Sequence, residues 1–124
     1  MLDKKLFDIL AHDGIVAIAT CCDNVPHVVN TWHNYVNVTE DGRLLIPAGG
    51  MAETERNIAA NNKIVLALGS SQVEGLSGSL GAGFCIEGTA KFLSEGADYD
   101  MMHEKFSWLS RVLEVTVTSM KETM

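Results

Sequence analysis

Short connections between strand-like segments constrain the fold of this chain more than any other feature. Val25 to Val38 and Arg43 to Ile46 both have strand-like sequences, and only the turn Glu40-Asp41-Gly42 separates the two runs. Asp-Gly between two such runs is a strong hairpin signal. Parallel strands need connections of a dozen residues or more, usually helical, and the chain has no alternating strand and helix rhythm. The sequence therefore predicts a mainly β fold, an antiparallel barrel or sheet with peripheral helices.

The remaining segments fit this plan. The run from Phe84 to Phe92 alternates cleanly, which places Phe84, Ile86 and Ala90 on a core face. Further strands are expected at 15–20, 63–68 and 111–118, and helices at 3–13, 52–61 and 95–108. The segment Gly69 to Gly83 has five glycines and four serines, and we interpret it as a long flexible loop. Residues 119–124 show no periodicity.

Composition sets the broad class. A chain of 124 residues with 47 % hydrophobic and 20 % charged residues predicts one globular domain spanning 1–124. No apolar run reaches membrane-spanning length and the N-terminus lacks signal-peptide features. We therefore expect a cytoplasmic protein that does not associate with a membrane. The net charge of −7 argues against nucleic acid and allows a basic protein partner.

The three cysteines leave two interpretations open. Cys21 and Cys22 are adjacent and Cys85 is remote, a spacing that fits neither a disulfide between neighbours nor a usual metal site. His12 and His27 flank the cysteine pair, so the two interpretations are reduced thiols in a turn and, as the alternative, a metal site. We favour the thiols and expect no metal.

The stretch from Asn30 to Asn57 holds the candidate functional residues. Its strand is polar on both faces, which a strand serving only a core would avoid. Gly49 and Gly50 then permit close backbone approach, and a helix begins near Ala52. The N-terminus of a helix suits a phosphate, and Thr54 and Arg56 would add a hydroxyl and a cation there. The pattern is compatible with a site for a flat, phosphorylated ligand, and equally with an ordinary hairpin followed by a helix.

Several motifs together resemble a known family. They are GIVAIAT at 14–20, PHVVNTW at 26–32, IPAGGMAETE at 46–55, LGS at 68–70, and Phe106 two residues before Trp108. In these motifs the chain resembles the small FMN-binding proteins of the split-barrel group, which includes pyridoxamine phosphate oxidases and flavin reductases. The resemblance implies a six-stranded antiparallel Greek-key split β-barrel that forms a homodimer with one FMN per subunit.

The resemblance also implies roles for individual residues. Asn30, Thr31 and Thr54 would meet the phosphate and ribityl chain. Trp108 and Met124 would reach the flavin from the neighbouring subunit. The other residues expected to border the cofactor are Trp32, Pro47, Ala48, Gly49, Gly50 and Met51. The family commonly places a lysine at the phosphate where this chain has Glu53, and Arg56 would supply the missing cation.

Two classes of function remain open on the sequence. The first is an electron-transfer flavoprotein in which FMN supplies the redox chemistry and no residue is assigned a catalytic role. The second is an oxidoreductase, either a flavin reductase or a catalyst like pyridoxamine phosphate oxidase. The latter needs a second phosphate site rich in arginine and lysine, and the nine basic residues form no such cluster. We therefore favour the carrier.

Overall fold

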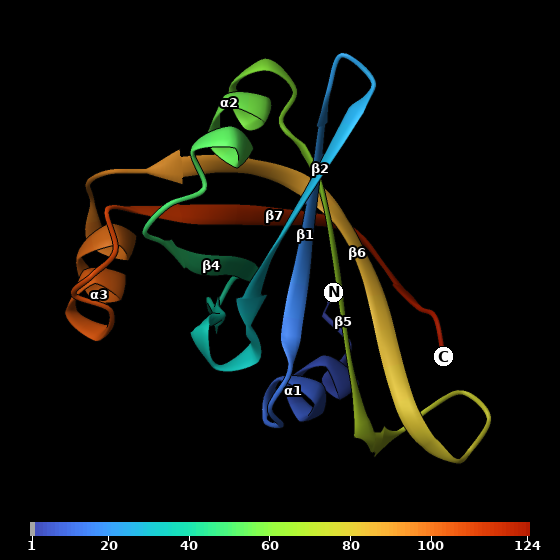
Figure 1. Cartoon of the computed structure of the whole chain (residues 1–124). Helices are drawn as coiled ribbons and strands as arrows, with labels where there is room; N and C mark the ends of the chain where they lie inside the picture. The colour runs from blue at the N-terminus through green and yellow to red at the C-terminus, as the bar shows by residue number, and fades with distance from the viewer. Residues whose placement is uncertain (1) are drawn as a thin grey trace.

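The computed structural model describes residues 2–124 and consists of one antiparallel sheet with three helices (Figure 1). The strand order is β2-β1-β5-β6-β7-β4-β3, and every neighbouring pair is antiparallel. The strands are β1 (Ile15–Cys22), β2 (Val25–Trp32), β3 (Asn37–Val38), β4 (Arg43–Ala48), β5 (Lys63–Glu74), β6 (Leu80–Leu93) and β7 (Arg111–Glu122). The predicted fold class is confirmed, and the sheet is open, resembling a split barrel.

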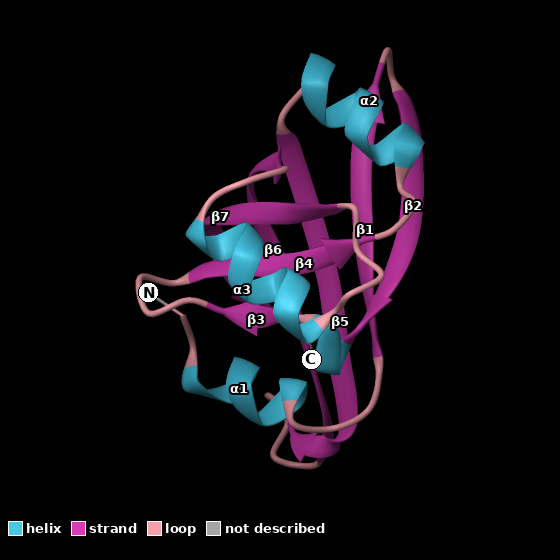
Figure 2. Ribbon diagram, turned by 90° about the vertical axis from the view of Figure 1, so that its left-hand side faces the viewer, coloured by secondary structure: helices cyan, strands magenta, loops and turns pink. Residues whose placement is uncertain are grey.

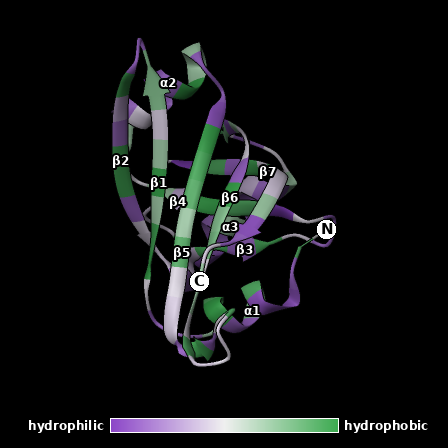
Figure 3. Ribbon diagram, turned by 90° about the vertical axis from the view of Figure 1, so that its right-hand side faces the viewer, coloured by the Kyte–Doolittle hydropathy of each residue, from purple (hydrophilic) through white to green (hydrophobic). Residues whose placement is uncertain are grey.

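Three α-helices and one 3-10 turn complete the fold: α1 (Lys4–Leu10), α2 (Ala52–Ala60), α3 (Ala97–Lys105) and η1 (His33–Tyr35). The side chain of Asp3 caps α1 by accepting from the Lys5 N–H at 2.8 Å. Figure 2 shows the helices in front of the sheet, and Figure 3, from the opposite side, shows β2, β1 and β5 in front. The predicted helices are present and each is shorter than expected.

The core lies between the curved sheet and the helices. Leu6 and Ile9 of α1 and Ile58 of α2 are buried in the larger hydrophobic cluster with side chains from the sheet. Phe84, Ile86 and Ala90 belong to the same cluster, which confirms the predicted core face of β6. A smaller cluster joins Met102 of α3 to Leu45, Leu109 and Val112.

The predicted strand from Val25 to Val38 is interrupted at residues 33–36. The chain turns at η1, because His33 bonds to the loop after α1 instead of to a neighbouring strand. Its N–H donates to the Gly14 carbonyl at 2.9 Å, and its Nδ1 lies 2.7 Å from the carbonyl oxygen of His12. The break divides the expected strand into β2 and β3, so the sheet has seven strands instead of six.

The predicted loop Gly69–Gly83 is also wrong. β5 continues to Glu74 and β6 begins at Leu80, so the connection is a tight turn on a long hairpin. Its glycines allow close strand contact: a Cβ at Gly75 would lie 2.1 Å from the Gly81 carbonyl oxygen. The C-terminal segment likewise extends β7 to Glu122, where the predicted strand ended at residue 118.

Candidate functional site

The site begins where β4 ends. Pro47 and Ala48 are buried and pair with Val112 and Arg111 of β7. Because β3 pairs only with Leu44 and Leu45, Pro47 has a neighbouring strand on one side, a position that tolerates proline. The Ala48 carbonyl accepts from the N–H of Ser110 at 2.9 Å, which closes the strand end and delivers the chain to the exposed Gly49 and Gly50.

Helix α2 begins directly after this Gly-Gly hinge. Met51 is the N-cap residue in a left-handed conformation, with φ of 66°, and supplies no side-chain cap. The first intrahelical bond runs from the Glu55 N–H to the Met51 carbonyl at 2.9 Å. The N–H groups of the preceding helical residues therefore have no partner within the helix. This end of α2 offers unpaired donors and the positive end of the helix dipole.

Thr54 lies in the first turn of α2 and is fully buried, and its Oγ1 has no hydrogen-bond partner among the described residues. An unsatisfied buried hydroxyl costs stability, so a native protein rarely keeps one without another role. One turn later, Asn57 donates from Nδ2 to the Thr20 hydroxyl of β1 at 3.1 Å. The helix is thus anchored to the sheet through Asn57, and Thr54 is left as an available donor and acceptor.

Arg56 and Glu53 lie on the outer side of the same helix. Arg56 Nη2 is 3.4 Å from Glu53 Oε1, and the two side chains are 69 % and 53 % exposed. Glu53 also lies 3.7 Å from Nδ1 of His27 on β2, which brings the helix beside that strand. In this arrangement Arg56 forms an exposed i, i+3 ion pair, a contact worth only a few tenths of a kcal/mol.

Aromatic rings gather on the other side of the hinge. A Cβ at Gly49 would lie 3.1 Å from Cε3 of Trp108, so a larger residue here would require the indole ring to shift. The Trp108 ring is 5.6 Å from the ring of Tyr35 and 5.9 Å from that of Phe106. Tyr35 belongs to η1, directly after β2. Phe106 and Trp108 therefore connect the hinge with η1, which directly follows β2.

The polar residues of β2 alternate as predicted. Asn30 and Trp32 are exposed on one face of the strand, whereas Thr31 is buried on the other. Met124 lies elsewhere, beside Gly83 of β6, whose N–H is 3.4 Å from the Met124 carbonyl oxygen. In the sheet order, three strands, β1, β5 and β6, lie between β2 and β7. The structure thus brings together the hinge, Thr54, Trp108 and the end of β2, and leaves Met124 apart.

Comparison with known proteins identifies the family. The model of the pyridoxamine 5'-phosphate oxidase family matches residues 2–123. The chain belongs to this family. It is 39 % identical, over the full length of both chains, to a protein named FMN-binding protein from Nitratidesulfovibrio vulgaris (strain DSM 19637 / Miyazaki F).

Solved structures of this family's fold are similar as well. HupZ of Group A Streptococcus superposes with a TM-score of 0.80 at 18 % identity, covering 98 % of this chain and 94 % of HupZ. An FMN-binding protein from Syntrophomonas wolfei superposes with a TM-score of 0.70 at 14 % identity, covering 98 % and 88 %. At these identities the likeness confirms the fold.

One residue beside the hinge, Arg111, is not among the predicted site residues. Arg111 begins β7 and donates from Nη2 to the Gly50 carbonyl at 2.8 Å. Its Nε lies 3.1 Å from Glu55 Oε1, and its guanidinium lies 5.5 Å from the centre of the Phe92 ring. Only the pairing of β4 with β7 puts Arg111 beside the hinge, and no local pattern carries that register.

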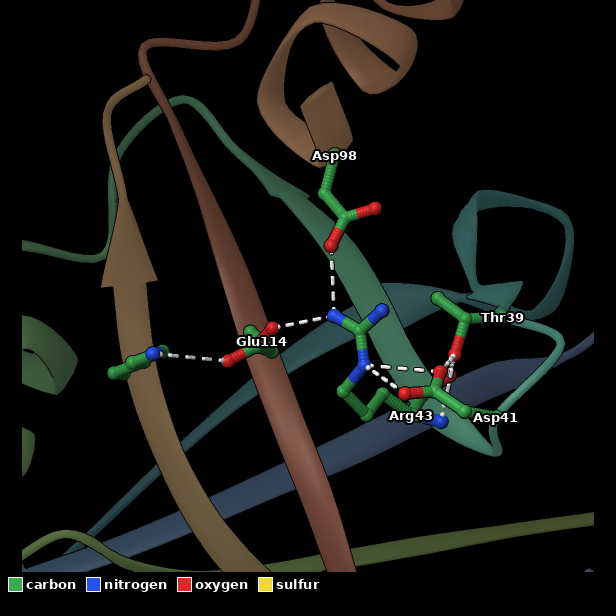
Figure 4. A network of polar contacts seen from close by, with 6 residues as sticks. Thr39, Asp41, Arg43, Asp98 and Glu114 are labelled. Atoms are coloured by element: carbon green, nitrogen blue, oxygen red, sulfur yellow. Dashed lines mark hydrogen bonds and ion pairs between the residues drawn. The ribbon is translucent and has the colours of Figure 1, made fainter. Parts of the chain in front are cut away.

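A second arginine stabilises the element that carries Trp108. Arg43 of β4 donates from Nη1 to Asp98 of α3 at 2.7 Å and to Glu114 of β7 (Figure 4). These hydrogen bonds, with those to Asp41, raise the pKa of the Arg43 guanidinium above its ordinary value. The Thr39 hydroxyl and then Arg43 lower the pKa of Asp41. Arg43 is committed to this network and is not available to a ligand at the hinge.

Cys21, Cys22 and Cys85 are free thiols, and burial and the neighbouring Asp23 raise the pKa of Cys22. Between residues 2 and 124, His, Cys, Asp and Glu side chains form no group of three suited to a metal ion. Within the same range, no helix is long and apolar enough to cross a membrane.

Proposed function

We propose that this chain binds one noncovalent FMN per subunit and acts in electron transfer. A full-length relative at 39 % identity bears the name FMN-binding protein, and the family membership gives the same fold context. When bound, FMN would supply reversible redox chemistry through its isoalloxazine. The protein would contribute position, shielding and electrostatics.

The observation that carries the proposal is the unpartnered hydroxyl of Thr54. It lies at a helix start that already offers free N–H groups, directly after Gly49 and Gly50, and a Cβ at Gly50 would meet nothing within 4 Å. A phosphate would satisfy this hydroxyl and the helix donors together. The residues present therefore fit a phosphorylated cofactor.

The other assignments follow the family resemblance. Asn30 and Thr31 would bind the ribityl chain and phosphate with Thr54. The isoalloxazine would be bordered by Trp32, Pro47, Ala48, Gly49, Gly50 and Met51, and Trp108 would reach the flavin from the neighbouring subunit. Met124 would arrive from a second copy, because it lies across the sheet from Trp32 in its own chain. Arg56 is the weakest of these assignments, since Glu53 already pairs with it.

The homodimer forms part of the proposal. The outward face of β2, β1 and β5 carries exposed apolar side chains, and Ile15, Val28, Trp32 and Val65 are 48 %, 60 %, 53 % and 37 % exposed. They are neighbours in the sheet: Ile15 pairs with Trp32, and Ala19 lies between Val28 and Val65. Figure 3 views this side. Exposed Asn30, which pairs with Ala17, lies between Trp32 and Val28 on this face. Exposed apolar side chains on one sheet face favour burial against a partner, here a second copy.

An electron carrier fits the charges better than an enzyme acting on a second phosphorylated substrate. The three arginines, Arg43, Arg56 and Arg111, each pair with at least one carboxylate of the same chain. The net charge of −7 would favour encounter with a basic redox protein. The alternative, a flavin reductase or an oxidase acting on pyridoxamine phosphate, predicts substantial turnover without a protein partner.

Purification and flavin titration test the proposal. We expect a yellow protein whose released cofactor is FMN. The flavin-free form should bind FMN more tightly than riboflavin, as measured by titration with tryptophan and flavin fluorescence as readouts. Equal affinity for the two flavins would contradict a phosphate site at α2. Rapid steady-state oxidation of NADH by the purified protein would favour a reductase over a carrier.

A further inference from the structure

We infer that Arg111 is a positioning residue that sets the orientation of the Gly50–Met51 peptide and thereby aims the phosphate-binding donors of the hinge. The inference rests on the proposed function, because it concerns the phosphate end of the same flavin site. The cation expected near the phosphate is then Arg111 of β7. It acts through the hinge peptide and does not need to contact the phosphate itself.

The contact of Arg111 with the hinge is made to one carbonyl. Its Nη2 donates to the Gly50 carbonyl at 2.8 Å, and its backbone is held beside the hinge by the pairing of Arg111 with Ala48. In a trans peptide the C=O and the following N–H point in opposite directions, and none of the peptides between residues 2 and 124 is cis. With the Gly50 carbonyl turned to Arg111, the Met51 N–H points away from the guanidinium.

Because residue 50 is a glycine, the orientation of the Gly50–Met51 peptide is poorly fixed unless another group contacts it. Gly50 is exposed, and a Cβ built on it meets nothing within 4 Å, so packing does not fix its peptide. Met51 is held with φ of 66°, a conformation that most residues avoid. A hydrogen bond from a charged donor is a sufficient constraint to hold such a peptide in one of its two orientations.

Arg111 is itself well fixed. The guanidinium stacks near Phe92 at 5.5 Å and its Nε lies 3.1 Å from Glu55 Oε1, in the first turn of α2. That Nε is buried and makes no aligned hydrogen bond within residues 2–124. Arg111 therefore connects β7, the hinge and the helix start, and it offsets the charge of Glu55 close to where a phosphate would bind.

The nearby cations cannot replace this contact. Arg56 is exposed and paired with Glu53, and Arg43 is bound to Asp98 and Glu114 at the opposite end of β4. Lys63 follows the other end of α2, roughly 13 Å along the helix. Arg111 alone among these contacts the hinge.

The test compares FMN and riboflavin affinities in matched variants of the full chain. We expect Arg111→Gln to weaken FMN binding about tenfold or more, and riboflavin binding less than about threefold, since a misoriented peptide removes a phosphate donor. Lys91→Gln is the control, because it removes the same charge from a 70 % exposed side chain of β6. The FMN to riboflavin affinity ratio of this control should equal that of the parent.

Arg111→Lys separates positioning from charge. Lysine retains the positive charge but lacks the planar fork that spans the Gly50 carbonyl and Glu55. We expect its affinity ratio to fall with that of Arg111→Gln and to stay low at 0.5 M salt, where a purely long-range charge effect is screened over about 4 Å. A parental ratio in Arg111→Lys, or a deficit that disappears in salt, would overturn the inference.

A measurement without flavin provides a second readout. In the flavin-free protein, the amide NMR signals of Gly50 and Met51 should shift in Arg111→Lys and remain in place in Lys91→Gln. If the parent binds neither flavin, the proposed function fails and the inference fails with it. If the parent prefers FMN and both Arg111 variants keep that preference, only the inference fails.

Discussion

Single residues at the start of α2 have opposite effects on folding and on ligand binding. The Thr54 hydroxyl is buried and has no hydrogen-bond partner within residues 2–124, whereas that of Thr20, also buried, accepts from Asn57. Helix α2 therefore carries a threonine whose hydroxyl is unsatisfied, and strand β1 beneath it carries a threonine whose hydroxyl is satisfied. Because burying an unpaired polar group costs free energy, the chain gives up stability at Thr54 for a group that a phosphate can use.

Thr54→Val should raise the free energy of unfolding of the flavin-free protein by about 1 kcal/mol, since it removes an unsatisfied hydroxyl with little change of volume. The same variant should weaken FMN binding about tenfold. Thr20→Val, which leaves the Asn57 amide unpaired, should lower the free energy of unfolding by about 1 kcal/mol. Urea unfolding and flavin titration measure both effects. If Thr54→Val destabilises the protein as Thr20→Val does, the Thr54 hydroxyl has a hydrogen-bond partner in the folded protein.

Glu53 tests the electrostatics of the same helix end. Glu53→Gln removes a negative charge near the expected phosphate and should tighten FMN about fivefold, and Glu53→Lys should tighten it tenfold or more. Riboflavin affinity should hardly change in either variant, and both gains should shrink as salt is raised. FMN affinity that is the same for glutamate, glutamine and lysine would show that the carboxylate points away from the ligand.

The sequence was most informative about these residues where the signal is local. Two glycines before a helix, with Thr54 in its first turn, predicted the helix start, and Trp108 lies against the hinge that the sequence singled out. Arg111 was missed because its contact with Gly50 depends on the register between β4 and β7. Local patterns do not encode a register between strands 63 residues apart.

At the scale of elements, α3 combines a small apolar contact with polar anchors. Met102 is its only fully buried side chain. Asp98 pairs with Arg43 at 2.7 Å, and Lys105 donates to Asn37 at 2.8 Å. These contacts hold α3 against β4, and the connection after it carries Phe106 and Trp108. The sequence predicted this helix but not its anchors, because ion pairs between distant segments leave no periodic signal.

The pH dependence of stability should report this network. The pKa of Asp41 is lowered from its ordinary value of 3.8, so its contribution is present above that pH and is lost as the pH falls through the folded value. Asp41→Asn should therefore flatten the decline of stability below about pH 4. Urea midpoints measured between pH 2 and 6 provide the test. Identical slopes in parent and variant would show that Asp41 titrates alike in both states.

Other elements were mispredicted for physical reasons. The segment 69–83 is rich in glycine and serine, and this composition is typical of loops. In the structure, Gly69 and Gly75 allow the strands of a twisted hairpin to approach closely, so their role is steric. Conversely, the β-like sequence after Trp32 turns away because buried His33 finds its partners at Gly14 and His12.

For the whole molecule, the outward sheet face predicts the oligomeric state. Ala19→Glu places a charge at the centre of the apolar face, between Val28 and Val65. We expect it to dissociate a dimer at micromolar concentration and to weaken FMN binding, because a buried unpaired charge is costly and the proposed flavin site includes residues of a second copy. Ala60→Glu, an exposed position at the end of α2, is the matched control. Analytical ultracentrifugation decides, and a monomeric parent protein would contradict the homodimer.

The order of strands in the sheet also has a kinetic consequence. β5 and β6 pair as sequence neighbours, but β1 joins β5 across about fifty residues and β4 joins β7 across about seventy, as the partners Val16 and Leu68, and Arg43 and Thr116, show. Closing such large loops precedes any gain from pairing, so refolding should take about milliseconds to seconds. The long hairpin is the natural nucleus. Substitutions in β5 and β6 should therefore slow refolding, whereas loss of Arg43 should mainly speed unfolding in stopped-flow experiments.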